Sequence, residues 1–484
     1  MYNEKRSNIT KILIIIMMLF LCISLCSCNA LQNIINDMEN NPIINNNDDN
    51  NHNDNNDNND ASFVSSKKVG ALNEVSYSFN EGCDYCNETL FNKLSFFSSN
   101  IFDLCVDYDN SDNYCISPLS IYMAFSILHY LGDDNVKRDV EEMLEMDSED
   151  ISDSGCVFLK MLNEKYFNGK LVSKLLLTNS IWLDSGLDAN QIVLDELGEK
   201  YYCYAHNTPF SLDNKKANKE IREFIKEKTN GLIDKDFELS DRTIFAIINT
   251  LYFKDIWKDG AILDKAYRNF CDENGMNAVK KIFLYSNYIE GVVQKNDDYS
   301  FFYAETHSNY KIKFILPNEG VSIDKCMDSK TIDYVNKFSD YNNYDNNDSK
   351  DNNSKITQKT SCIFPAFEIS SSTPLKEILE DNNYLPHAFA SYNTPLIKGA
   401  CFVSDIKHQV ILNVNDEGIE GAAVTIITNE KSAHFEFNVE YNEFVINRPF
   451  IAIVTDTNNC ILFIAKITNP ESSINGSNLE FVKD

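Results

Sequence analysis

Three stretches of the chain show the hydrophobic spacing of amphipathic or buried helices. Residues 117–131 begin with Ser-Pro-Leu-Ser and continue as IYMAFSILHYL, which predicts a helix with Ser117 as its cap. Residues 132–147 predict a second, more charged helix. In residues 214–228 the apolar positions lie on one helical face, and the Asn-Gly pair that follows is a typical helix end.

Other stretches have the composition or alternation of β-strands. Residues 243–253, TIFAIINTLYF, are rich in β-branched and aromatic side chains, as expected for a central strand buried on both faces. Further strands are predicted at 175–183, 310–317, 407–414, 449–456 and 460–467. The turn residues between the last two strands indicate a hairpin, and no internal repeat is present. The pattern therefore predicts one α+β domain built on large sheets.

Two segments rich in Asn and Asp interrupt this pattern. Residues 40–60 and 339–355 contain too few apolar side chains to form a core. We expect the first to belong to a flexible tether over residues 28–82. The second is interpreted as a surface-loop insertion in a domain over residues 83–475, which leaves residues 476–484 as a C-terminal tail.

The N-terminus has the features of an export signal. Three basic residues accompany the start of an apolar run at 12–25, which is shorter than the roughly 20 residues of a membrane-spanning helix. The run ends in Leu-Cys-Ser-Cys, which resembles a bacterial lipoprotein cleavage box. We expect residues 1–27 to be removed and Cys28 to carry lipid, so that the protein is extracytoplasmic, either secreted or anchored to the cell envelope. A plain secretory signal or a membrane anchor is the alternative.

Net charge argues against a nucleic-acid partner. The 484 residues include 43 basic and 73 acidic side chains, a formal net charge of −30. A nucleic-acid binder would need a compact basic patch to overcome this field, and the sequence shows none.

The fourteen cysteines do not describe a disulfide framework. Loss of the signal and lipidation of Cys28 would leave eleven, an odd and dispersed set whose disulfide state stays open. Cys83 and Cys86 form a C-x-x-C pair, but no second pair completes a zinc site, so no metal is expected.

Catalytic motifs are also missing from the sequence. The seven histidines are scattered, and there is no G-x-S-x-G elbow, phosphate-binding loop or H-E-x-x-H motif. We expect neither an enzyme nor a cofactor.

Six segments, in order along residues 90–470, resemble motifs of the serpin family of serine-protease inhibitors. They are NYCISPLSI at 113–121, KTNG at 228–231, NTLYFKDIW at 249–257, VSDIKH at 403–408 with NDEG at 415–418, NRPF at 447–450, and FIAKITNP at 463–470. Asp255 stands where the family usually has glycine. Each motif is weak alone, whereas six in the right order identify the chain as resembling this family.

This resemblance implies an α+β serpin fold with three β-sheets, about eight to nine helices and an exposed reactive-centre loop. It also implies a mechanism in which a serine protease cleaves the loop. The loop then inserts as a new central strand of the largest sheet and drags the covalently linked protease with it. We expect a monomer that traps a serine protease. The alternative is a non-inhibitory serpin-fold binding protein, or one that a protease merely cleaves.

The resemblance places the reactive loop in NDEGIEGAAVTIITNEKSAH at 415–434. This stretch has no proline and is rich in small side chains, as an inserting strand requires, and its glycine supplies a hinge. The expected hinge and inserting residues are Glu417, Gly418, Ile419, Glu420, Gly421, Ala422, Ala423 and Thr425. With Glu420 outward, the inward residues are Ile419, Gly421, Ala423, Thr425 and Ile427. A β-branched Ile419, where the family has Thr or Ser, could slow insertion and turn an inhibitor into a substrate.

The cleaved bond has two main candidate positions. The usual loop length counted from Gly418 gives Ser432–Ala433, and a loop one residue shorter gives Lys431–Ser432. We favour Lys431–Ser432, because a trypsin-like protease binds lysine in a pocket with an acidic floor. The bond before Lys431 is a weaker third candidate.

Four polar residues match the family's polar cluster beneath the main sheet: Ser117, Ser120, Asn249 and His408. Buried side chains of these types need hydrogen-bond partners. A cluster that exchanges partners as strands separate would supply them. The alternative is a set of ordinary core polar residues with no control role.

Overall fold

The computed structural model describes residues 63–65, 70–73, 75, 88–106, 108, 113–152, 163–167, 170–234, 238–258, 261–338, 357–419, 439–477 and 479–482. Residues 60–484 form one compact unit. Several expectations from the sequence lie outside the described residues: the signal at 1–27, Cys28, Cys83, Cys86, the insertion at 339–355, and the loop residues from Glu420 to Ala433.

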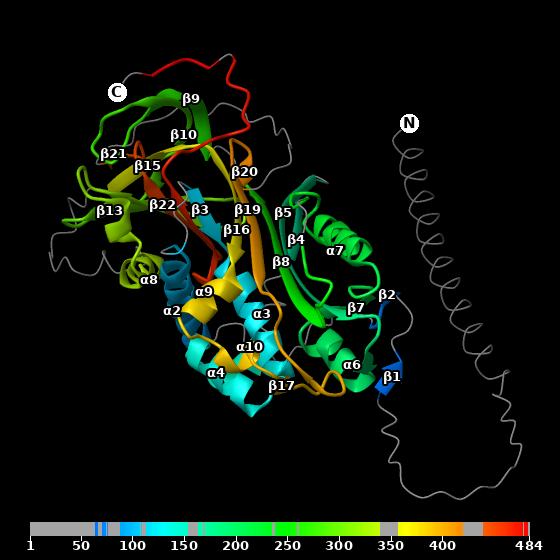
Figure 1. Cartoon of the computed structure of the whole chain (residues 1–484). Coiled ribbons are helices and arrows are strands. Elements are labelled where there is room, and N and C mark those ends of the chain that lie inside the picture. Colours follow the sequence, from blue (N-terminus) through cyan, green and yellow to red (C-terminus); the bar gives the residue numbers. More distant parts are fainter. Residues whose placement is uncertain are drawn as a thin grey trace, which may run out of the picture. The chain divides into compact units, whose positions relative to one another are not determined.

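The described strands form three large sheets, as expected, together with two small two-stranded sheets (Figure 1). The largest has the order β16-β19-β20-β8-β5-β7-β2, with β4 paired to β5 beside this path. Its strands are β2 (Gly70–Ala71), β4 (Asn163–Phe167), β5 (Lys170–Asp184), β7 (Cys203–Thr208), β8 (Phe245–Ile256), β16 (Phe367–Pro374), β19 (Lys407–Val414) and β20 (Gly418–Ile419).

A six-stranded sheet has the order β12-β13-β14-β22-β23-β3, and a five-stranded sheet has β11-β15-β10-β9 with β21 paired to β15. The strands of the six-stranded sheet are β3 (Asn113–Ile116), β12 (Gln294–Lys295), β13 (Tyr299–Glu305), β14 (Lys311–Pro317), β22 (Phe450–Thr455) and β23 (Ile461–Ile467). Those of the five-stranded sheet are β9 (Ile262–Phe270), β10 (Val279–Ser286), β11 (Ile289–Glu290), β15 (Thr357–Pro365) and β21 (Val439–Val445). The small sheets pair β1 (Phe63–Ser65) with β6 (Asp188–Asn190), and β17 (Tyr392–Asn393) with β18 (Ala400–Cys401).

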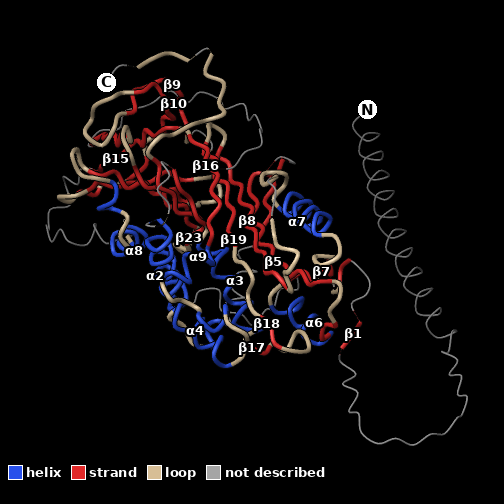
Figure 2. The backbone as a smooth tube through the Cα atoms, viewed as in Figure 1, coloured by secondary structure: helices blue, strands red, loops and turns tan. Residues whose placement is uncertain are grey.

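The helices gather mainly at one end of the sheets, whereas α7 lies beside the largest sheet (Figure 2). Within the described residues they are α2 (Glu88–Val106), α3 (Pro118–Leu131), α4 (Asp134–Leu144), α6 (Gln191–Lys200), α7 (Asn214–Lys228), α8 (Ser329–Lys337), α9 (Leu375–Asp381), α10 (Pro386–Phe389) and the 3-10 helix η1 (Ile323–Cys326). This number agrees with the expected eight to nine.

Local signals explain where the predicted helices begin and end. The bounds of α7 are those predicted: the Asp213 side chain accepts the Lys216 N–H, and Asn230 and Gly231 follow the helix with φ of 53° and 84°. Helix α4 is shorter than the predicted 132–147. It begins later because the Asp133 carboxylate accepts the backbone N–H groups of the first turn, which makes Asp133 the cap.

Strand β8 lies at the centre of the largest sheet and is buried on both faces, as its composition predicts. One face contributes to the main core, which includes residues of α2 and α3. The other face belongs to a second apolar cluster beneath α7. This outer cluster consists of Trp182, Phe210, Ala217, Ile221, Ile225, Ile233, Leu239, Ala246 and Ile248, with Phe224 and Ile411 packed against it. The centre of the sheet therefore accepts apolar side chains on both faces.

Both ends of the folded unit extend beyond the boundaries expected from the sequence. Upstream of residue 83, β1 and β2 pair with β6 and β7, and the Asn73 side chain donates to Cys203 O at 3.0 Å. Downstream of residue 475, the Tyr267 N–H donates to Glu480 O at 2.8 Å and the Val482 N–H donates to Tyr267 O at 2.9 Å. Part of the expected tether and most of the expected tail thus pack on the domain, through backbone pairing that hydrophobic patterning does not report.

The described residues contain no cluster of three or more His, Cys, Asp or Glu side chains able to hold a metal. Among them, no helix is long and apolar enough to cross a membrane. No disulfide joins the eight described cysteines to one another: Cys105, Cys115, Cys203, Cys271, Cys326, Cys362, Cys401 and Cys460.

Candidate functional site

Strand β20 places the start of the candidate loop inside the largest sheet. Gly418 pairs with Ile256 and Ile419 pairs with Asp255, both on β8, while Ile419 also pairs with Val414 on β19. Both pairings are antiparallel, so β19 and β8 run parallel to each other with β20 between them. In the described part of the sheet, β19 and β8 connect through β20 and have no pairing register of their own. The chain therefore leaves β19, turns, and returns as the two-residue strand β20 between β19 and β8.

A network of hydrogen bonds holds the turn between β19 and β20. The Asn415 N–H donates to Gly418 O at 3.0 Å, and the Glu417 N–H donates to Asn415 Oδ1 at 2.8 Å. Trp257, just beyond β8, adds two contacts: its indole Nε1–H donates to Asn415 O at 2.7 Å and its backbone N–H donates to Glu417 O at 3.0 Å. The Trp257 indole therefore contacts the turn directly.

Close packing explains why glycine precedes Ile419. A Cβ on Gly418 would clash with the carbonyl oxygen of Asp255 and would lie 2.7 Å from Ile256 Cα. The Ile419 side chain is 1% exposed and belongs to the main core. The inward orientation expected for Ile419 is thus the one observed, and Gly418 permits it by allowing the backbone to approach β8.

Asp255, the residue that replaces the family's glycine, is a fully buried acid directly opposite Ile419. Its Oδ2 accepts hydrogen bonds from Thr306 Oγ1 at 2.8 Å and from the Ser308 N–H at 3.1 Å. Burial raises the pKa of Asp255 to about 7, although these hydrogen bonds oppose the shift.

The structure brings the four polar residues predicted from the sequence into one hydrogen-bonded cluster beneath the sheet. His408 Nε2 accepts the Ser117 N–H at 2.9 Å, and the Ser117 hydroxyl caps α3 by accepting the Ser120 N–H. The Ser120 hydroxyl donates to Asn249 Oδ1. Since His408 is on β19 and Asn249 is on β8, the N-terminus of α3 links the two strands that flank β20.

A fifth member of the cluster, Asn179, was not predicted. The Asn249 amide donates to Asn179 Oδ1, and the Asn179 amide donates to Tyr201 O at 2.7 Å. The available signal was an amide side chain between two hydroxyl residues in the middle of the otherwise apolar strand LLLTNSIWL. Such a residue needs a buried partner, but the sequence does not say which one.

His408 is held in its neutral form. Burial lowers the pKa of His408 to about 4, so at neutral pH the ring nitrogen Nε2 keeps the lone pair that accepts the Ser117 N–H. On the neighbouring strand β16, Thr373 lies opposite His408 and its hydroxyl shares a 2.7 Å hydrogen bond with the Tyr114 hydroxyl. Polar contacts thus continue from β19 to β16.

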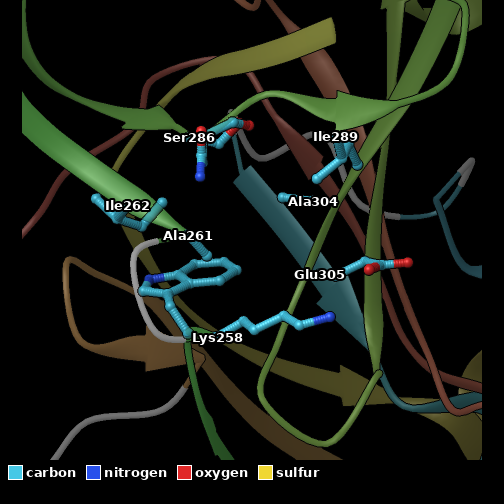
Figure 3. Close-up of a pocket in the computed structure, with 9 residues that line it drawn as sticks. Lys258, Ala261, Ile262, Ser286, Ile289, Ala304 and Glu305 are labelled. Carbon is cyan, nitrogen blue, oxygen red and sulfur yellow. The ribbon is translucent and has the colours of Figure 1, made fainter. Parts of the chain in front are cut away.

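A cavity borders Trp257. Figure 3 shows five of the residues that line it: Lys258, Ser286, Ile289, Ala304 and Glu305. Because Trp257 also lines this cavity, the residue that contacts the loop turn has an open space beside it.

The candidate loop connects two different sheets. Its start, β20, belongs to the largest sheet, and the described chain resumes at β21, which pairs in parallel with β15 of the five-stranded sheet. Lys431, Ser432 and Ala433 lie between these strands in sequence, outside the described residues.

Comparison with known proteins assigns the family. The family profile described as "Serpin (serine protease inhibitor)" matches residues 92–470. The match covers more than half of the chain, and this chain belongs to the serpin family.

Individual relatives are distant but cover most of the chain. It is 26% identical to antithrombin-III of Ovis aries over 393 residues, 75% of this chain and 77% of the relative. It is 27% identical to serpin A3-1 of Bos taurus over 376 residues, 75% of this chain and 84% of the relative.

Solved structures show the same fold. Serpin48 of the insect Tenebrio molitor matches with a TM-score of 0.65 at 18% identity, covering 80% of this chain and 99% of that structure. Human thyroxine-binding globulin, solved as a complex with thyroxine, matches with a TM-score of 0.62 at 20% identity, covering 79% and 100%. The α+β serpin fold expected from the sequence is confirmed.

Proposed function

We propose that this chain inhibits a trypsin-like serine protease by loop insertion and covalent trapping, with Lys431–Ser432 as the cleaved bond. The observation that carries the proposal is β20, two residues seated between strands that otherwise share no register. After cleavage, the residues that follow Ile419 would extend β20 as a full strand between β19 and β8.

Continuing the register of β20 gives a chemically consistent inward face. Gly421 would lie opposite Phe253, where a small residue leaves room for a large one. Thr425 would lie between Asn249 and His408, the two strand residues of the polar cluster. The Thr425 hydroxyl, which can both donate and accept hydrogen bonds, would therefore lie beside buried polar side chains.

The outward face of the same register is also consistent. Ala422 would lie opposite Ile411 and Ile426 opposite Ile248, and both isoleucines belong to or pack against the outer cluster beneath α7. An inserted strand would thus be buried on both faces. In a strand with one face exposed to solvent, the outward positions would be polar. Burial of both faces explains why outward positions such as Ala422 and Ile426 are apolar.

We further propose an extracytoplasmic location, with the chain secreted or held at the cell envelope by lipid on Cys28. The support is the signal-like N-terminus, followed by a long Asn/Asp-rich segment that would separate the folded unit from a membrane.

The central experiment mixes residues 60–484 with trypsin-like, chymotrypsin-like and elastase-like proteases and resolves the products on denaturing gels. The expected product is an SDS-stable covalent complex with the trypsin-like enzyme. Cleaved chain without a complex for every protease would overturn inhibition in favour of a protease substrate or a non-inhibitory serpin. Mass spectrometry of the released C-terminal peptide tests the bond: an N-terminal Ser432 supports it, and Ala433 assigns Ser432–Ala433 instead.

The loop-insertion step has its own test. Ala423→Pro removes a backbone N–H from the middle of the proposed inserted strand, so it should abolish the covalent complex while cleavage continues. Ala423→Ser keeps the N–H and serves as the matched control. Equal complex formation by both variants would rule out insertion in the proposed register.

A further inference from the structure

We propose that Asp255 controls whether Gly418 and Ile419 stay seated between β19 and β8. Its neutral carboxyl keeps the two residues in place, and its carboxylate favours their release. Asp255 is thus a positioning residue that makes the first step of strand insertion respond to pH.

The first argument is the position of the carboxyl group. Asp255 is fully buried, and its backbone pairs with Ser173 on one side and with Ile419 on the other. The Gly418 backbone packs so closely that a Cβ there would clash with the Asp255 carbonyl oxygen. As long as β20 is seated, it forms part of the enclosure around this acid.

The second argument is incomplete hydrogen bonding. Oδ2 accepts from Thr306 and Ser308, whereas Oδ1 is buried and has no hydrogen-bond partner among the described residues. A neutral carboxyl tolerates this site at modest cost, but a carboxylate with one unsolvated oxygen does not. Withdrawal of β20 would admit water to Oδ1 and so would stabilise the charged form.

These two facts link protonation to the position of the hinge. If the seated state binds the Asp255 proton more tightly than the withdrawn state, then proton loss must shift the equilibrium towards withdrawal. Burial raises the pKa of Asp255 to about 7 in the seated state, against about 3.9 for an exposed aspartate. The shift in population should therefore take place as pH rises from the lower of these pKa values towards about 7, and it should level off above that, where Asp255 is ionised in both states.

The charged and titratable groups around Asp255 do not cancel the rise in its pKa. They come from each element around Asp255: Lys254 on its own strand, Lys165 on β4, Lys174 on β5, His307 and Tyr310 on the turn after β13, and Asp416 and Glu417 before β20. Of these, Lys165 lowers the pKa of Asp255 electrostatically, less than burial raises it. Lys174 pairs with Glu164 at 2.7 Å and Asp416 pairs with Lys265. His307 is the neighbouring histidine, and its substitution serves as an explicit control.

The equilibrium is a property of the folded chain, so it is measured without any protease. Only its consequence for the inhibition rate rests on the proposed function. Failure of the covalent-complex assay would leave this measurement unaffected, and the two outcomes are therefore distinguishable.

The chain contains its own reporter of the hinge. It has two tryptophans, and the Trp257 indole donates to Asn415 O in the loop turn. The second, Trp182, stacks on His206 at 4.3 Å, so it is replaced by phenylalanine to leave Trp257 alone. The experiment records Trp257 emission of residues 60–484 carrying Trp182→Phe from about pH 4 to about pH 9. Hydrogen exchange of the Trp257 amide, which donates to Glu417 O, is followed in parallel on the unsubstituted chain.

We expect an emission transition that is complete near pH 7, with its midpoint at lower pH. The protection factor of the Trp257 amide should fall by up to about tenfold per pH unit as pH rises towards about 7, and it should stay constant above that pH. Asp255→Asn should abolish both effects, and Asp255→Gly, which introduces the family's usual residue, should do the same. His307→Gln should keep them. A flat wild-type profile, or an unchanged midpoint in both Asp255 variants, would overturn the proposal. Loss of the transition in His307→Gln alone would assign it to the histidine and overturn it as well.

Discussion

Asn249 lies in the middle of the polar cluster, because its side chain joins two neighbours at once. Its Oδ1 accepts from Ser120 and its amide donates to Asn179, which connects α3, β8 and β5. The next residue, Thr250, is buried on the same strand, yet its hydroxyl has no hydrogen-bond partner within the described residues. Of these two adjacent polar side chains, Asn249 forms buried hydrogen bonds and the Thr250 hydroxyl forms none within the described residues. Their removal should therefore change the free energy of unfolding by different amounts.

We predict that Asn249→Ala lowers the free energy of unfolding by about 2–4 kcal/mol, since it leaves the Ser120 hydroxyl and Asn179 Oδ1 buried without partners. Thr250→Val is the matched control and should stay within about 1 kcal/mol of wild type, because it removes a hydroxyl that makes no bond there. Urea unfolding of residues 60–484 measures both. Equal losses in the two variants would show that the cluster contributes nothing beyond ordinary burial.

At the scale of elements, local signals decided what the sequence could predict. Helix α7 was predicted to the residue because an apolar face and an Asn-Gly stop agree, and the Asp213 cap seen in the structure fixes its start. Strand β19 was predicted to the residue as well. The polar cluster was found through family resemblance, whereas its partner Asn179 depends on the packing of α6 and β5, which no local pattern encodes.

The C-terminal segment is the clearest element that patterning missed. Gly476 packs against Tyr267 so closely that a Cβ would clash with its hydroxyl oxygen, and the Lys280 ammonium lies 4.3 Å from the Tyr267 ring and 5.2 Å from the Phe481 ring. Val482 and Glu480 complete the backbone pairing with β9. The segment therefore covers an edge strand of the five-stranded sheet, where an uncovered edge would invite pairing with another chain.

Removing residues 476–484 should lower the free energy of unfolding by about 1–3 kcal/mol, from lost hydrogen bonds and cation–π contacts. It should also promote self-association through β9. Glu480→Ala is the control, because Glu480 contributes its backbone oxygen to the pairing and the substitution leaves that oxygen in place. Urea unfolding and light scattering provide the measurements. A truncated chain as stable and as monomeric as the control would contradict a covering role.

For the whole molecule, the decisive feature is the seam in the largest sheet between β19 and β8. The sheet is continuous on either side of this seam, but across it the described pairing consists of two residues of β20. Under the proposed function, a full strand in the seam would satisfy backbone groups along both neighbours and bury an apolar ribbon between two clusters.

Cleavage at Lys431–Ser432 should therefore raise the melting temperature of the chain by more than about 10 °C. The measurement compares circular-dichroism melts of intact and cleaved residues 60–484. Cleaved Ala423→Pro should lack most of the increase, since its strand cannot complete the ladder. Cleaved wild-type chain that melts at the intact temperature would show that the seam stays unfilled.

The two seated residues also have a kinetic consequence. The costly event in adding a strand is nucleation, when loop ends are first brought together and one register is chosen. Here Gly418 fits a space that excludes any side chain, and Ile419 fixes which residues turn inward. A slip by one residue would turn Glu420 towards the core and is thereby excluded. Insertion would begin from a formed nucleus and proceed as elongation, so its rate would depend on how fast the seam opens ahead of the advancing strand.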